Sequence, residues 1–135
     1  MEELNIIVLF AMIFMHIVDD YYLQGCLAQF KQKIWWEKNA PDELYKYDYI
    51  VALIEHAFSW TFMIMIPVTI ALAIQHKFNI QFYIFFFMLN WIIHGFTDNY
   101  KANKKKINLI LDQTVHILQI IYTWINFMGL LLGLI

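Results

Sequence analysis

The chain reads FYIFFFML from Phe82 to Leu89, a run of eight residues without a charged side chain. A helix built from this run is apolar on every side, whereas a helix on the surface of a soluble protein carries a broad polar face. The same character extends through the chain, since 61% of its 135 residues are hydrophobic and only 15% are charged. We therefore favour an integral membrane protein over a soluble four-helix bundle.

Four long apolar segments follow one another, at about residues 3–25, 49–75, 79–99 and 107–135. Each has about 20 residues or more, enough at ~1.5 Å of rise per residue to cross a ~30 Å hydrocarbon core. Short connections join the second segment to the third and the third to the fourth, and such connections force neighbouring helices to run antiparallel. The sequence thus predicts an all-α fold, with residues 1–135 forming one transmembrane domain, an antiparallel bundle of four spans.

The connection over residues 26–48 is more polar than the spans and contains Pro41 as a break. It carries the pair Trp35-Trp36, and tryptophan is enriched where a membrane meets water. Its apolar residues recur at helical spacing, and they are Leu27, Phe30, Ile34 and Trp35. We expect an interfacial amphipathic helix between the first and second spans, in a position to cover a site as a lid.

Lysine placement predicts the orientation in the membrane. All nine basic residues are lysines, and eight of them lie in two connections, after the first span and after the third. By the positive-inside rule these two connections are cytoplasmic, which leaves both termini outside. Glu2 and Glu3 stand where a cleavable signal would carry basic residues, so we expect the first span to be retained.

Three of the spans carry a histidine and an aspartate four residues apart, a spacing that places both on one helix face. The pairs are His16/Asp20, His94/Asp98 and, in reverse order, Asp112/His116. In antiparallel helices this reversal puts every histidine deeper than its aspartate. The second span adds His56 and has Ala52 where the acid would be. We expect the four histidines to share one layer in the cytoplasmic half, roughly 10 to 15 Å below the surface.

An ionisable side chain near the centre of a span costs on the order of 2.5 to 3.5 kcal/mol, unless several satisfy one another or hold a cation. Imidazole and carboxylate are ligands of zinc, manganese and non-haem iron, and carboxylates also orient imidazole ligands. We expect a divalent metal ion, zinc first, with manganese or iron as alternatives. The candidate ligands are His16, Asp20, His56, His94, Asp98, Asp112 and His116. Seven candidates leave two ions, or one ion beside a catalytic carboxylate, both open.

Candidate catalytic residues are the three aspartates of these pairs and two neighbours, namely Asp20, Asp98, Asp112, Lys101 and Glu55. Lys101 lies three residues after Asp98 and either binds a substrate phosphate or extends to the lipid headgroups. Glu55 is either a general base or a hydrogen-bonding residue between helices. Supporting roles next to the ligands are expected for Asp19, Gln24, Asn90 and Gln113.

Several other functions find little support in the sequence. A net charge of −2, without a face that interleaves basic and aromatic residues, argues against a nucleic-acid partner. Cys26, the single cysteine, has no basic helical neighbour for nucleophilic catalysis. A haem is a weaker candidate than a metal ion, because haem sites have few carboxylates near the iron and this chain has several beside its histidines. Gly129 and Gly133 form a GxxxG pattern, which serves either a homodimer or close packing within the monomer.

At these motifs the chain resembles a family of small bacterial and phage membrane proteins of unassigned function. The family marks are HxxxDxxxQ, HxxxDxxK and DQxxH, which here are His16/Asp20/Gln24, His94/Asp98/Lys101 and Asp112/Gln113/His116. The chain departs from the pattern at Asp19-Asp20-Tyr21, where a single aspartate followed by an aromatic residue is usual. The resemblance spans almost the whole chain. It implies a four-span metal-site protein of the bacterial inner (plasma) membrane, loosely similar to inner-membrane metal-dependent hydrolases.

These observations favour a membrane-embedded, metal-dependent hydrolase that acts on a lipid or lipid-linked phosphate at the cytoplasmic leaflet. The metal would activate water and a free carboxylate would accept its proton. One alternative is a proton or divalent-cation carrier or channel, although the outer halves of the spans carry few polar residues. Another is a non-catalytic phage effector that binds a host membrane protein through a fold with a structural metal.

Overall fold

The computed structural model describes residues 2–133, with side chains from Asn5 onward. Four long helices make up most of this region, and they are α1 (Glu2–Val18), α4 (Asp48–Ile74), α5 (Ile80–Ala102) and α6 (Leu109–Leu132). The described residues contain no strand. Four segments, one on each of these helices, are long and apolar enough to cross a membrane, as the sequence predicts. The all-helical fold and the four candidate spans of a multi-pass membrane protein are therefore confirmed.

The predicted limits of the second and third spans lie within three residues of those of α4 and α5, and the fourth span is predicted to begin two residues before α6, with its predicted end outside the described residues. The first span is predicted to reach residue 25, whereas α1 ends at Val18 and a π-helical turn follows it. Local chemistry explains several helix ends. The side chain of Asn79 accepts a hydrogen bond from the amide of Phe82 at 3.1 Å, and Asn108 caps α6 through the amide of Leu111 at 2.9 Å. Gly133 ends α6 with a φ of +72°, a left-handed conformation that favours glycine. The need to end the helix is thus sufficient to explain a glycine at position 133. A homodimer through Gly129 and Gly133 stays a prediction.

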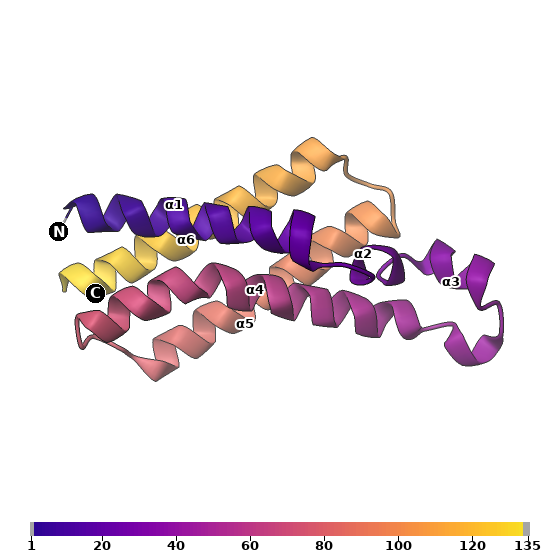
Figure 1. Ribbon diagram of the computed structural model, residues 1–135, viewed down its shortest axis with the longest axis horizontal. Coiled ribbons are helices and arrows are strands. Elements are labelled where there is room, and N and C mark those ends of the chain that lie inside the picture. Colours follow the sequence, from indigo (N-terminus) through magenta and orange to yellow (C-terminus); the bar gives the residue numbers. More distant parts are fainter. Residues whose placement is uncertain (1, 134–135) are drawn as a thin grey trace.

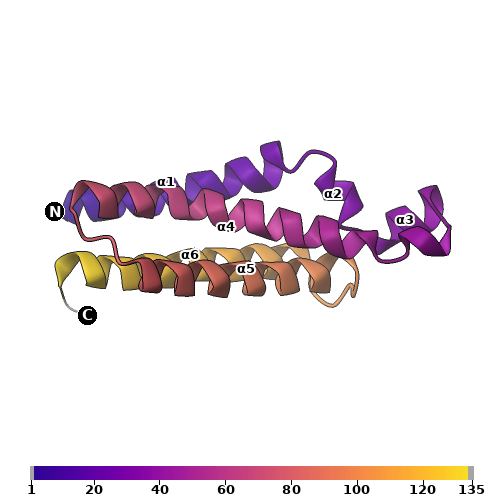
Figure 2. The same cartoon turned by 90° about the horizontal axis from the view of Figure 1, so that it is seen from below.

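The four helices lie in two layers. Figure 2 shows α1 and α4 in one layer and α5 and α6 in the other. The start of α1 and the end of α6 lie at one end of the molecule, and α2 (Leu27–Phe30) and α3 (Lys33–Asn39) lie at the opposite end (Figure 1). We refer to these as the terminal end and the α2–α3 end.

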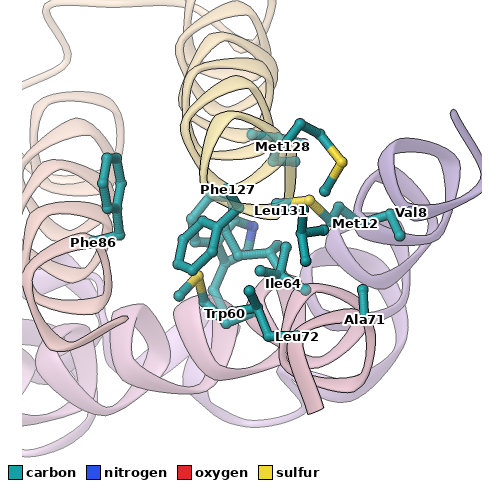
Figure 3. Close-up of a cluster of buried hydrophobic side chains, with 13 residues drawn as sticks. Val8, Met12, Trp60, Ile64, Ala71, Leu72, Phe86, Phe127, Met128 and Leu131 are labelled. Atoms are coloured by element: carbon teal, nitrogen blue, oxygen red, sulfur yellow. The ribbon is translucent and has the colours of Figure 1, made fainter. Parts of the chain in front are cut away.

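An apolar core fills the half of the molecule near the terminal end. The fully buried side chains there include Trp60, Ile64 and Leu72 of α4 and Phe127 of α6, beside Met12 of α1 and Leu131 of α6 (Figure 3). Close packing of such side chains, rather than removal from water, holds helices together inside a membrane. The side chains on the outer surface are also largely apolar, as expected for helices that face lipid.

The connection between α1 and α4 differs from the single helix expected there. It forms α2, α3 and a 3₁₀ turn at Glu43–Tyr45, because Gln32 adopts an extended conformation that separates α2 from α3. Phe30 and Trp35 pack at 4.5 Å between ring centroids. Asn103, at the end of α5, accepts a hydrogen bond from the amide of Lys33 at 2.7 Å and so ties this connection to the bundle.

A π-helical turn at Asp19–Leu23 follows α1 and matters for the site. In a regular helix two consecutive side chains point about 100° apart, whereas a π turn widens the helix and re-aims its side chains. Asp19 and Asp20 are both buried here. The turn therefore directs two adjacent carboxylates into the interior of the bundle.

Candidate metal centre

Four histidines from four helices meet in one buried layer, between the apolar core and the α2–α3 end. The ring centroids of His94 and His116 are 4.2 Å apart, and those of His56 and His94 are 5.1 Å apart. His16 joins the layer with its ring centroid 5.7 Å from that of His116. All four side chains are at most 2% exposed. The shared depth expected from sequence spacing is therefore present in the structure.

Asp98 lies at the centre of the layer. Its Oδ2 is 3.1 Å from Nε2 of His56, and its Oδ1 is 3.4 Å from Nε2 of His116. Asp20 approaches His56 Nε2 with Oδ1 at 3.4 Å, and Asp112 approaches His116 Nε2 with Oδ1 at 3.5 Å. All three predicted aspartates thus contact histidines, including histidines of other helices.

The spacing of these atoms fits a bound metal ion. Two groups of three buried residues have ligand atoms within 4.8 Å of one another, namely Asp20/His56/His94 and His94/Asp98/His116. Bonds of ~2.0 to 2.1 Å in a tetrahedral site place ligand atoms about 3.3 Å apart. The Nε2 atoms of His56 and His94 are 3.2 Å apart, close to that separation.

Unsatisfied polar atoms give a second indication. Within the described residues, Oδ1 of Asp20, Oδ1 of Asp112 and Nε2 of His116 are buried without a hydrogen-bond partner. Burying a polar atom without a partner is costly, and all three atoms lie at the contacts just described. A cation bound at either ligand group would satisfy Asp20 Oδ1 or His116 Nε2, whereas Asp112, a predicted ligand, belongs to neither group and its Oδ1 would stay free.

The charges of the layer are compatible with a divalent ion. The buried carboxylates of the layer belong to Asp19, Asp20, Asp98 and Asp112. Two ammonium groups offset them, since Lys31 Nζ is 2.5 Å from Asp98 Oδ2 and Lys101 Nζ is 2.6 Å from Asp112 Oδ2. With neutral imidazoles, the form that binds metal, two of the four negative charges remain without a countercharge. One divalent cation, or protons on two of the imidazoles, would neutralise them.

His16 has a different role from the one expected. The indole nitrogen of Trp60 donates to His16 Nδ1 at 2.7 Å, and because an indole only donates, Nδ1 must be the acceptor. The proton therefore lies on Nε2, which donates to Oε1 of Gln113 at 3.0 Å. Both ring nitrogens are occupied, and His16 belongs to neither ligand group. The structure thus does not support His16 as a metal ligand and gives it an orienting role.

Gln113 links two of the carboxylates. With its oxygen turned to His16, its amide nitrogen donates to Asp20 Oδ2 at 3.3 Å and to Asp112 Oδ2 at 3.1 Å. Both amide hydrogens are thereby used, one on a residue that follows α1 and one on α6. This is the supporting role expected of Gln113, because partners of this kind fix the orientation of metal-binding groups.

Three residues of the site were not singled out by sequence reasoning. Trp60 stacks on His94 with ring centroids 4.1 Å apart, Lys31 reaches Asp98 from the end of α2, and Ser59 donates to Asp19 at 2.7 Å. Trp60 lies four residues after His56, and that spacing was a usable signal. Lys31 had no such signal, because it lies outside the spans and its position depends on the fold of the connection.

The remaining candidates lie at the margin or outside the layer. Glu55 is exposed on α4 and forms no hydrogen bond or ion pair within the described residues, so the structure does not bring it to the site. Gln24 donates to the backbone oxygen of Asp20. Asn90 lies deeper and acts through Gln119, which contacts His116 Nδ1 at 3.4 Å. Lys101 contacts Asp112 rather than Asp98, and its side chain is 36% exposed.

Comparison with known proteins adds no functional information. No protein-family model, no curated protein and no solved structure matches the chain. The family resemblance drawn from the motifs therefore stays a prediction, and the function is argued from the site alone.

Proposed function

We propose that the protein is a membrane-embedded, metal-dependent hydrolase that acts on a lipid or lipid-linked phosphate. One observation carries the proposal, namely the two ligand groups that share His94 inside four membrane-length helices. Such a concentration of ionisable groups in a span is expensive unless it serves a function. The donor set is imidazole and carboxylate without thiolate, which suits zinc first and also manganese or iron.

The proposal includes an orientation. The helices would form an antiparallel bundle in the bacterial inner membrane, with the α2–α3 end at the cytoplasmic side, because eight of nine lysines lie in the connections at that end. Trp35 and Trp36 would then lie at the membrane interface. The site would open toward the lipid headgroups of the cytoplasmic leaflet, and both termini would lie outside.

Residues of the layer divide into holding and reacting groups. Three of these residues, either Asp20, His56 and His94 or His94, Asp98 and His116, would hold the ion, which when bound polarises a phosphoryl oxygen and provides a water nucleophile at neutral pH. Asp112 would accept the proton of that water with Oδ1, which has no hydrogen-bond partner, while Gln113 and Lys101 hold Oδ2.

Lys101 and the apolar core would complete the chemistry. Lys101 is partly exposed beside Asp112, where its ammonium group would hold a phosphate oxygen as a point charge. The apolar core closes the site toward the terminal end, which restricts water on that side.

The same core favours hydrolysis over transport. A carrier or channel needs polar groups along the whole path across the membrane. On the side of the histidines toward the terminal end, Gln119 donates a hydrogen bond to Asn90, and Asn90 donates one to Thr123. Buried apolar side chains, among them Phe86 and Phe127, then fill the described part of the bundle toward the terminal end. A buried polar layer that apolar side chains close on one side is more consistent with a reaction there than with passage.

Metal content and phosphate release test the proposal. Protein purified in detergent and loaded separately with zinc, manganese or iron should retain about one ion per chain by elemental analysis, and it should release phosphate from phosphatidic acid. His94→Asn should lose the ion and the activity. The matched control is His76→Asn, since His76 is exposed at the terminal end and its φ of +53° is one that asparagine tolerates. Wild-type protein that retains none of these metals would refute the proposal.

A further inference from the structure

A cavity of about 460 Å³ opens between α1 and α6 beside the histidine layer. His16 and Gln113 line its polar part, and Ile13 and Ile117 line it one turn closer to the terminal end. Tyr21 and Tyr22, both exposed, line it toward the α2–α3 end.

The lining changes from apolar to polar along the helices. Ile13 precedes His16 by about one turn of α1, and Tyr21 follows it by about one turn. Because α1 and α6 are both membrane-length helices, an opening between them faces the bilayer rather than water. The polar part of the lining lies toward the lysine-rich connections. A lipid in the leaflet at that end has its polar head group on the same side and its acyl chains on the other.

A second cavity provides a contrast. It measures about 440 Å³ and lies between α4 and α5, where Ile54, Ala57 and Gly95 contribute to an almost wholly apolar lining. No residue of the histidine and aspartate layer lines it. The α1–α6 cavity, in comparison, reaches the layer directly through His16 and Gln113.

Gln113 connects the α1–α6 cavity with the metal ligands. The same side chain that lines the cavity donates to Asp20 and Asp112 at 3.3 and 3.1 Å. A head group seated against Gln113 would therefore lie one side chain away from these carboxylates. Lys101 Nζ lies 2.6 Å from Asp112 Oδ2, the same carboxylate oxygen to which Gln113 donates.

We propose that the α1–α6 cavity is the lateral access site for a membrane lipid with a phosphate head group. The lipid enters from the bilayer with its head beside Gln113, in the part of the cavity that Tyr21 and Tyr22 line, and its first acyl carbons against Ile13 and Ile117. This inference rests on the proposed function for the choice of a phosphate-bearing lipid. It extends that function by assigning the route by which the lipid reaches the metal site and the cavity residues that distinguish an amphiphile from a soluble ligand. The α4–α5 cavity takes no part in recognition of the head group.

Matched filling variants test the access site. Ile117→Trp fills the α1–α6 cavity, and Ile54→Trp places the same side chain in the α4–α5 cavity. Zinc-loaded protein in detergent is incubated with phosphatidic acid, diacylglycerol or inorganic phosphate, and bound lipid is counted by native mass spectrometry. Wild type and Ile54→Trp should bind phosphatidic acid in preference to diacylglycerol. Ile117→Trp should bind phosphatidic acid at least about tenfold more weakly, with its zinc content unchanged.

Each other outcome is decisive. Equal binding of phosphatidic acid by Ile117→Trp and wild type, or a loss confined to Ile54→Trp, overturns the access site. Displacement of the lipid by inorganic phosphate assigns the cavity to a soluble ligand and also overturns it. If Ile117→Trp loses zinc, the same lipid-binding measurement is made on Ile13→Phe, which fills the cavity from α1, and its result decides. Lipid binding that depends on Ile117 in a protein without metal would support the access site and refute the proposed hydrolase, so the two failures are distinguishable.

Discussion

Trp60→Phe tests whether hydrogen bonds outside the ligand groups control metal affinity. The change removes the indole donor 2.7 Å from His16 Nδ1 and retains an aromatic ring against His94, whose centroid is 4.1 Å away. Without that donor, the proton of His16 is no longer confined to Nε2, and the orientation of Gln113 between Asp20 and Asp112 is lost.

Two magnitudes follow for this variant. Leaving a buried acceptor without its donor costs about 1 to 3 kcal/mol of folding free energy. Loss of a partner that orients metal-binding groups lowers metal affinity by roughly 10- to 100-fold, and the indirect path through Gln113 places the expected loss near tenfold. Zinc affinity is measured by competition with a coloured chelator, and stability by thermal unfolding in the same detergent.

Trp91→Phe is the matched control. Its indole nitrogen also donates a hydrogen bond, at 3.0 Å to the backbone oxygen of Ile54, but away from the histidine layer. We expect this variant to lose little stability and no zinc affinity. If Trp60→Phe and Trp91→Phe bind zinc equally tightly, the chain of hydrogen bonds from Trp60 to Gln113 does not position the ligands, and that part of the account is wrong.

Three further predictions concern single residues. Gln113→Leu should weaken zinc binding by roughly 10- to 100-fold in the chelator assay, because two carboxylates lose their common donor, and unchanged affinity would contradict the bridging role. Lys31→Met removes the cation 2.5 Å from Asp98, so the metal-free protein should unfold at a lower temperature and gain more from added zinc than wild type; an equal gain would contradict the charge balance. Glu55→Gln should leave zinc content and phosphate release unchanged, because Glu55 is exposed, and a loss of activity would restore it as a catalytic candidate.

Much of the fold follows from patterns within single segments. A stretch such as that from Phe82 to Leu89 predicts a span because its composition alone excludes a surface helix. The spacing of His94 and Asp98 places both on one face, and only the interior of the bundle accommodates such a face in a membrane. These arguments need no knowledge of other helices, which is why they succeed.

Predictions that depend on several elements were less complete. His16 has the same spacing to Asp20 as the other pairs, yet its ring nitrogens are occupied by Trp60 and Gln113 from two other helices. The π turn at Asp19–Leu23, which buries two adjacent aspartates, has no counterpart in a 3.6-residue period. Lys31 contacts Asp98 from the connection between α2 and α3, where Gln32 interrupts the helix. The spacing of residues within the spans cannot predict the fold of that connection.

X-ray absorption at the zinc edge tests the central claim most directly. The purified, zinc-loaded protein should give a single set of nitrogen and oxygen neighbours at ~2.0 to 2.1 Å, with the multiple-scattering signal of imidazole. His94→Asn should abolish that set, and His76→Asn should leave it intact. A sulfur neighbour at ~2.3 Å would place the ion at the exposed Cys26, and a spectrum of hydrated zinc alone would mean that the buried histidines and aspartates hold no metal.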